Sequence, residues 1–136
     1  MAAACQRVAE LRYHADERRI FYGDIYGNPD GDVNVVYLPP VGPIAWHRHQ
    51  RQWDRLFLVS GVLRLRVGED AKTIVEHILI THDPKRGVYY IPPNFWHGYE
   101  ALAENTILLQ FNGPGKWNGS DEERHAIDDE MPWTTP

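Results

Sequence analysis

The sequence predicts an all-β protein, a sandwich or barrel of short strands, from three observations. Apolar or alternating segments recur along the chain, clusters of Gly and Pro separate them, and little of the chain has helical periodicity. A length of 136 residues is that of one domain. The expected strands are residues 19–26, 32–38, 44–49, 55–60, 62–67, 73–80, 87–91, 97–101 and 106–112.

Turn residues delimit the strands in the first half of the chain. Residues 27–31 (GNPDG) end the first strand, and Pro39-Pro40 stops the second, because Pro lacks the N–H that a sheet ladder needs. Gly42-Pro43 turns the chain into residues 44–49. The continuous apolar run over residues 55–60 is typical of a buried strand.

The second half of the barrel begins with a strictly alternating strand. Residues 62–67 place Arg64 and Arg66 opposite the apolar side chains, so we expect both arginines on a solvated sheet face. Turns at residues 68–70, 92–94 and 103–105 separate the remaining strands.

The two ends of the chain lack this pattern. Residues 2–12 are expected to form a short helical turn or an unpaired arm. Beyond Gly113 the alternation stops, and the acidic, Trp-containing residues 113–136 predict a tail that packs across the barrel without joining it.

Composition excludes several classes of partner. The net charge of −5 argues against nucleic acid and anionic membranes as partners, because proteins that bind them are normally basic. No segment has the length of a membrane span or the pattern of a signal peptide. Cys5 is the only cysteine, which rules out an internal disulfide and favours a cytoplasmic location.

His47 and His49 are the first candidates for a functional site. If residues 44–49 are extended, both imidazoles point to one face of the sheet, because side chains alternate across a strand. Two bases directed into one space are metal ligands, proton-transfer groups or a coincidence.

Two segments resemble the paired motifs of the cupin superfamily, which implies a jelly-roll barrel as the fold. The segment from Gly42 to Gly61 is similar to the first motif, G-x5-H-x-H-x4-E-x6-G. It has one residue fewer after its glycine and Asp in place of Glu. The segment that begins at Gly87 is similar to the second motif, G-x5-P-x-G-x2-H-x3-N, with Asn94 in place of the inner glycine. Asn is a suitable replacement because it enters left-handed conformations more readily than most residues. The matched residues are Gly42, His47, His49, Asp54 and Gly61, then Gly87, Pro92, Asn94 and His97.

The cupin resemblance implies a metal site. In metal-binding cupins the equivalents of His47, His49, Asp54 and His97 bind one divalent ion inside the barrel. Imidazole and carboxylate ligands suit iron, manganese, nickel, copper or zinc, and their spacing does not choose among these metals.

A narrower resemblance to the dTDP-4-dehydrorhamnose 3,5-epimerase family extends over nearly the whole chain. Residues 14–18 (HADER), 92–99 (PPNFWHGY) and 124–133 (RHAIDDEMPW) are similar to its opening, middle and closing segments. These enzymes need no metal. The resemblance implies that His47 abstracts a proton beside a keto group and that Asp129 orients it.

Three departures from this family argue against the simplest 3,5-epimerase mechanism. Asp54 stands at the lysine position, Gln110 at the position of the acid tyrosine, and Ile44 at the position of an arginine. The related nucleotide-sugar 3,4-ketoisomerases carry an H-x-H pair in this strand and move a proton between neighbouring carbons. His47 and His49 fit that chemistry better than they fit the 3,5-epimerase mechanism.

Three hypotheses follow. The first is a proton-transfer isomerase or epimerase that needs no cofactor and acts on a keto-sugar-like small molecule, with nucleotide-linked sugars among the candidates. The second is a metal-dependent dioxygenase, isomerase or lyase, and the third is a non-catalytic cupin that binds a sugar or metabolite. The resembling family also implies a homodimer. Candidate substrate-binding residues are Arg18, Trp46, Trp96, Tyr99 and Gln110.

Overall fold

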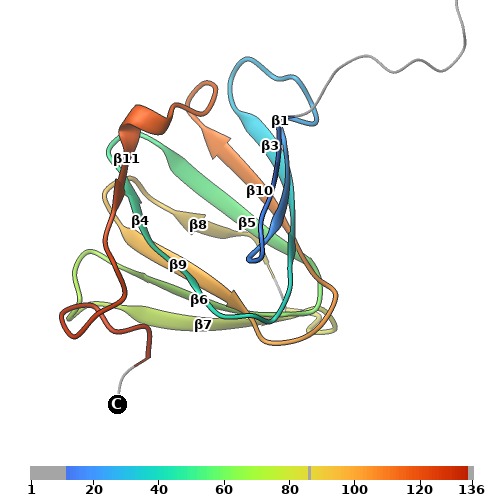
Figure 1. Cartoon of the computed structure of the whole chain (residues 1–136). Helices are drawn as coiled ribbons and strands as arrows, with labels where there is room; N and C mark the ends of the chain where they lie inside the picture. The colour runs from blue at the N-terminus through green and yellow to red at the C-terminus, as the bar shows by residue number, and fades with distance from the viewer. Residues whose placement is uncertain (1–11, 86, 135–136) are drawn as a thin grey trace, which may run out of the picture.

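Two antiparallel β-sheets face each other in the computed structural model, which describes residues 12–85 and 87–134 (Figure 1). The large sheet has the order β1 (Arg12–Ala15), β2 (Ile20–Gly23), β3 (Asp32–Leu38), β10 (Thr106–Gly113), β5 (Trp53–Ser60) and β8 (Tyr89–Ile91). The small sheet has the order β11 (Glu122–Arg124), β4 (Ile44–His49), β9 (Trp96–Ala101), β6 (Val62–Gly68) and β7 (Val75–Ile80). One short 3-10 helix, η1 (Gly119–Asp121), precedes β11. The predicted all-β jelly-roll is confirmed.

The predicted strands agree with the observed ones in the body of the barrel. β3 and β4 have the predicted bounds, and the other predicted strands differ at one or both ends. Asn94 adopts a φ of 68°, the left-handed conformation expected where it replaces glycine. β1 was not predicted: it forms a hairpin with β2, and residues 1–11 of the expected arm lie outside the described residues.

The inward-facing side chains change from apolar to polar along the strands. On β3 the pattern runs from Asp32 and Asn34 to Val36 and Leu38, all of them buried. β10 likewise carries Leu108 toward one end and Asn112 toward the other. One end of the barrel is therefore an apolar core, and the other end has a polar interior. The core residues are Val36, Leu38, Ile44, Leu56, Leu58, Leu63, Leu65, Leu79, Ile91, Tyr99, Ala101 and Leu108.

The C-terminal tail both joins the small sheet and covers its outer face. β11 pairs antiparallel with β4, with Arg124 opposite His47, so the expectation that the tail would not join the barrel is wrong. Beyond β11, Met131 and Trp133 pack on Trp46 to form a second buried cluster. The Trp46 indole N–H donates to the Met131 carbonyl oxygen at 2.9 Å, which fixes the tail to β4.

The tail also changes the environment of β6. Arg66 is buried and donates to the carbonyl oxygen of Trp133, so the expectation of a solvated Arg66 is wrong. Arg64 forms ion pairs with Glu76 (3.0 Å) and Glu100 (3.1 Å) on the neighbouring strands. The alternation of residues 62–67 predicts both arginines on the outer face of the small sheet. Only the three-dimensional structure shows that the C-terminal tail covers part of that face.

In the described part of the chain, no helix is long and apolar enough to cross a membrane.

Candidate active site

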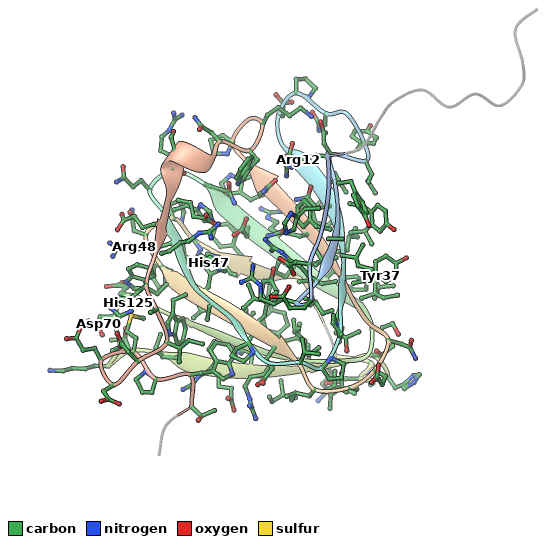
Figure 2. All side chains as sticks on the ribbon, in the orientation of Figure 1. Arg12, Tyr37, His47, Arg48, Asp70 and His125 are labelled. Atoms are coloured by element: carbon green, nitrogen blue, oxygen red, sulfur yellow. The ribbon has the colours of Figure 1, made fainter. Side chains whose placement is uncertain are left out.

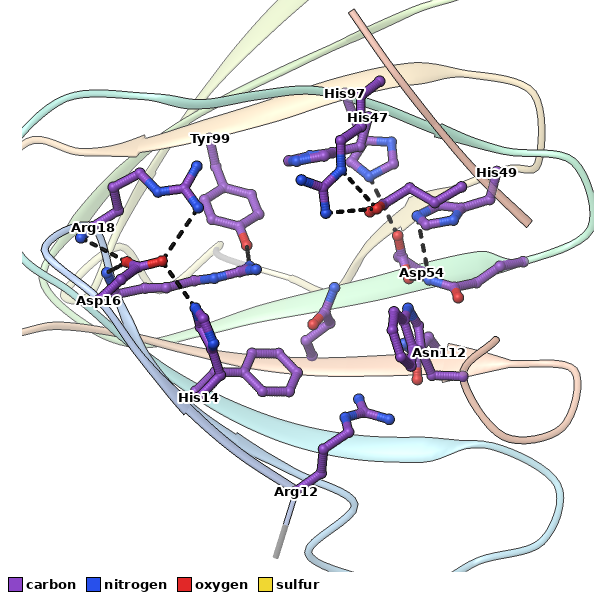
Figure 3. A pocket seen from close by; sticks show the side chains of 17 residues that line it. Arg12, His14, Asp16, Arg18, His47, His49, Asp54, His97, Tyr99 and Asn112 are labelled. Carbon is purple, nitrogen blue, oxygen red and sulfur yellow. Dashed lines mark hydrogen bonds and ion pairs between the residues drawn. The ribbon is translucent and has the colours of Figure 1, made fainter. Parts of the chain in front are cut away.

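A cavity of about 370 Å³ lies between the two sheets at the polar end of the barrel (Figure 3). The small sheet contributes three histidines and Tyr99, and the large sheet contributes carboxylate, amide and guanidinium groups. Its lining residues are Arg12, His14, Asp16, Arg18, Arg19, Phe21, His47, His49, Gln52, Asp54, His97, Tyr99, Gln110, Asn112, Trp117, Glu122 and Arg124.

The H-x-H pair points into this cavity, as the sequence predicts. His47 and His49 alternate on β4 with Trp46 and Arg48, which lie on the outer face; Figure 2 shows His47 inside the barrel and Arg48 outside it. His97 is the register partner of His47 on β9. The His97 ring centroid lies 6.0 Å from that of His47 and 5.6 Å from that of His49.

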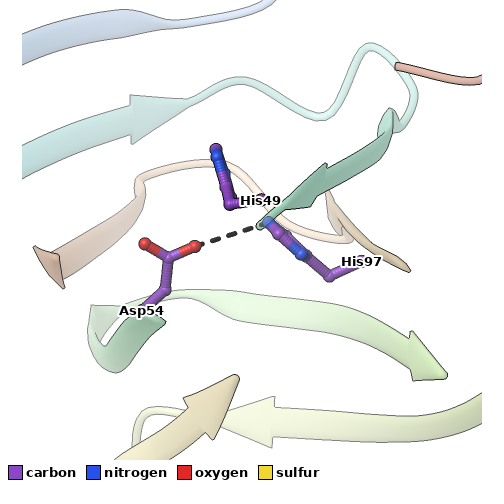
Figure 4. Close-up of side chains that lie close together, drawn as sticks. All are labelled: His49, Asp54 and His97. Carbon is purple, nitrogen blue, oxygen red and sulfur yellow. Dashed lines mark ion pairs between the residues drawn. The ribbon is translucent and has the colours of Figure 1, made fainter. Parts of the chain in front are cut away.

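Asp54 completes a compact group with two of these histidines (Figure 4). One ligand atom from each of His49, Asp54 and His97 lies within 4.8 Å of the others. His97 Nε2 is 3.4 Å from Asp54 Oδ2, and its Nδ1 is 3.1 Å from the Phe95 carbonyl oxygen. His47 is not in this group, so the predicted set of four ligands becomes three in the structure.

Burial drives these groups toward their neutral forms. It raises the pKa of Asp54 to about 6, against the opposing charge of His49. It also lowers the pKa of His49 and the pKa of His97. The 3.4 Å contact between His97 and Asp54 is therefore not a strong ion pair.

The basicity of His47 is also depressed. Burial, followed by the charges of His97, Arg19 and Arg124, lowers the pKa of His47 to about 3. Its imidazole is therefore neutral near pH 7 and able to accept a proton. An anionic ligand in the cavity would raise this pKa, because a nearby negative charge favours the imidazolium.

The β1–β2 hairpin supplies the other end of the cavity. His14 Nε2 is 2.9 Å from Asp16 Oδ2, and Asp16 also accepts from the Arg18 side chain at 3.2 Å. The Asp16 Oδ1 atom accepts the backbone N–H groups of Arg18 and Arg19. The contact with His14 is the main reason that the pKa of Asp16 lies far below its usual range.

Three of the predicted substrate-binding residues line the cavity. They are Arg18, Tyr99 and Gln110. The Tyr99 hydroxyl accepts a hydrogen bond from Arg19 at 3.3 Å, and the Gln110 side-chain oxygen accepts one from Asn34 at 3.4 Å.

Trp46 and Trp96 do not line the cavity, which corrects their assignment as substrate contacts. Trp46 is buried under the tail, and Trp96 packs on the outer face with the Arg48 guanidinium 4.4 Å from its ring centre. Strand alternation places both tryptophans opposite the neighbouring histidines His47 and His97.

Asp129 does not meet His47 in this structure, which corrects its assignment as the orienting carboxylate. It is exposed in a tail turn that Asp128 closes by accepting the N–H groups of Glu130 and Met131. Because Met131 is anchored on the outer face of β4, this turn lies on the side of the sheet away from the cavity.

The sequence did not identify several residues of the cavity. Arg12, His14, Asp16 and Arg19 come from the hairpin, whose first strand was not predicted. The alternation of Arg12 and His14 with the exposed Tyr13 was a signal for that strand.

The fold and the histidine-lined cavity define the chain as a cupin. Capsular polysaccharide assembling protein CapF from Staphylococcus aureus has this fold (TM-score 0.72, 20% identity), aligned over 86% of this chain and 34% of that one. Oxalate decarboxylase from Bacillus subtilis also matches (TM-score 0.70, 13% identity), over 85% of this chain and 30% of that one. The chain thus spans about a third of each, and at these identities the likeness concerns the fold alone.

A protein of Haloferax volcanii, described as a probable low-salt glycan biosynthesis epimerase (Agl13), is 30% identical over 138 residues, which cover 89% of this chain and 86% of that protein. The chain therefore belongs to the epimerase family of cupins that includes this protein. No protein-family model matches the chain.

Proposed function

We propose that this protein is an isomerase or epimerase that moves a proton on a carbonyl-bearing, sugar-like small molecule. One observation carries the proposal: the His47 imidazole is neutral and lies inside the cavity of a cupin that belongs to an epimerase family. A neutral imidazole is the form that can remove a proton from the carbon next to a carbonyl group.

Arg19 is the residue best suited to stabilise the enolate that this step forms. It lines the cavity near His47, donates to Tyr99, and has a buried Nε atom with no hydrogen-bond partner. None of the ion pairs formed among the described residues involves Arg19, whereas Arg12, Arg18 and Arg124 are paired with carboxylates. Arg19 can thus supply the positive charge that the replacement of lysine by Asp54 removes.

We propose an anionic substrate such as a nucleotide-linked sugar, because four arginines line the cavity against three carboxylates and Arg19 is not paired with any of them. Four guanidinium groups line it, together with the aromatic rings of Phe21 and Trp117. Arginine is suited to phosphate because its planar fork donates two parallel hydrogen bonds. The arginines are Arg12, Arg18, Arg19 and Arg124.

The test is incorporation of solvent deuterium into a 4-keto nucleotide sugar, followed by NMR. Deuterium is expected at a carbon adjacent to the carbonyl, at a rate that depends on protein concentration. Binding of the same sugar, seen as a higher melting temperature, without any exchange would instead support a non-catalytic binding protein.

A metal-dependent function is the second candidate, favoured by the group of His49, Asp54 and His97. Two imidazoles and a carboxylate are ligands that iron, manganese and zinc accept. The buried His49 Nδ1 atom has no hydrogen-bond partner, and Gln52 donates to Asp54 Oδ1 at 2.8 Å, a contact that would orient a ligating carboxylate. A bound divalent ion would act as a Lewis acid that polarises a carbonyl group.

Elemental analysis of protein purified without chelators tests the metal hypothesis. Near-stoichiometric metal is expected if the site is used, with a loss of at least about tenfold in affinity after His49→Ala, because one of three ligands is removed. His82→Ala is the control, since His82 is exposed and does not line the cavity. Metal that does not depend on His49 would contradict this candidate.

We also propose that the protein is a cytoplasmic homodimer. The single cysteine supports the location. The outer face of the large sheet carries exposed Tyr13, Tyr37, Val59 and Tyr90, and uncovered apolar faces of this kind mark protein interfaces. Light scattering is expected to give twice the chain mass, and Tyr37→Asp to reduce it; a monomeric wild-type protein would contradict the proposal.

A further inference from the structure

One imidazole of the cavity, that of His14, is used by neither candidate function described above. His14 comes from β1 of the large sheet, whereas His47 comes from β4 of the small sheet, and both line the same cavity. Figure 3 shows His14 and Asp16 at one side of the cavity and the three other histidines at the opposite side. A substrate held between the sheets would therefore have His14 on one side and His47, with the other two histidines, on the opposite side.

The His14 side chain is oriented by a carboxylate. The 2.9 Å contact between His14 Nε2 and Asp16 Oδ2 fixes the ring, and Asp16 is itself held by two backbone N–H groups and by the Arg18 guanidinium. A carboxylate on one ring nitrogen selects the tautomer and leaves the other nitrogen for proton transfer. The His14 side chain is 55% exposed, so it can exchange protons with solvent between turnovers.

The other polar groups of the large-sheet wall are poor proton donors to a substrate. Gln110 and Asn112 carry amides, which do not transfer protons near neutral pH. Both Asp54 oxygens already face partners, Oδ1 accepting from Gln52 and Oδ2 lying near His97. Tyr99 belongs to β9, in the same sheet as His47.

We propose that His14, oriented by Asp16, is the second proton-transfer residue of the site, so that the reaction inverts the configuration of the carbon beside the carbonyl. This inference rests on the proposed function. His47 takes a proton from the carbon beside the carbonyl, and the electron pair forms the enolate. The His14 imidazolium then gives the proton on Nδ1, the nitrogen not held by Asp16, to the opposite face of that carbon as the electron pair returns. His14 regains a proton from water and His47 releases one to water, so no net charge accumulates.

The test separates exchange from inversion in D₂O. In His14→Gln, deuterium exchange through His47 is expected to stay within about threefold of wild type, while formation of the inverted epimer falls by at least about 100-fold. Asp16→Asn is expected to reduce the rate of inversion and kcat by a smaller factor than His14→Gln does, without a matching change in KM. The reason is that Asp16 is a positioning residue, which acts through His14. Glu17→Gln and His82→Gln are the controls, since both residues are exposed and outside the cavity lining.

The results that would overturn the role of His14 differ from the result that would overturn the proposed function. Equal inversion rates in wild type and His14→Gln, or a parallel loss of exchange and inversion, would overturn the role of His14. A wild-type protein that exchanges deuterium without inverting any centre would overturn it as well. Absence of exchange in the wild-type protein would overturn the proposed function itself.

Discussion

Replacement of His47 by glutamine is expected to reduce deuterium exchange into a 4-keto nucleotide sugar by about 100- to 10,000-fold, the usual contribution of a general base. Glutamine keeps a polar side chain of similar length but cannot accept the proton. Among the described residues, the His47 side chain forms no hydrogen bond, and its neighbours are held by the β4 pairing with β9 and β11. The fold is therefore expected to remain intact.

The control for this variant is His82→Gln, which removes an exposed histidine from the turn that follows β7. Circular dichroism and thermal unfolding of both variants show whether the fold is preserved. Exchange by His47→Gln at the wild-type rate would contradict the assignment of His47 as the base.

The pH profile of kcat/KM provides a second readout of His47. This parameter reports the free enzyme, in which the pKa of His47 is lowered to about 3, so the imidazole stays unprotonated as the pH falls from about 7 to about 5. As the pH falls, kcat/KM is therefore expected not to decline with a midpoint of about 6.5, the ordinary pKa of histidine. An acid limb at that midpoint would contradict a buried, neutral His47 base.

Replacement of Trp46 by alanine is expected to lower the free energy of unfolding by about 3–5 kcal/mol, the usual cost of removing a buried aromatic side chain. Trp46 is 1% exposed, and its ring centroid lies 5.2 Å from that of Trp133. Its removal leaves a cavity under the tail and takes one of two hydrogen bonds from the Met131 carbonyl oxygen, which keeps the Asp128 N–H at 3.4 Å. For a domain of this size, a loss of this magnitude is a large part of the total stability.

Urea unfolding followed by circular dichroism measures this effect. Trp117→Ala is the matched control, because the Trp117 side chain is 44% exposed and its loss is expected to cost about 1 kcal/mol or less. An equally small cost for Trp46→Ala would show that the tail does not pack on β4.

The histidine site shows where sequence reasoning succeeds. The two-residue period of a strand is a local property, so spacing alone placed His47 and His49 on one face, and the cupin motif placed His97 beside them. The left-handed Asn94 is likewise a property of one turn. Asp54 also reaches the histidines, although aspartate is one methylene shorter than the glutamate of the motif.

The sequence by itself thus determined the β-sheet class, most strands and the inward direction of the matched histidines. The tertiary structure decided which distant segments share a surface. The tail covers Arg66 and turns Asp129 away from the cavity, and β1 brings His14 and Asp16 to the side opposite His47. The physical reason is that strand periodicity is set by backbone geometry within a few residues, whereas these placements depend on packing between segments far apart in the chain.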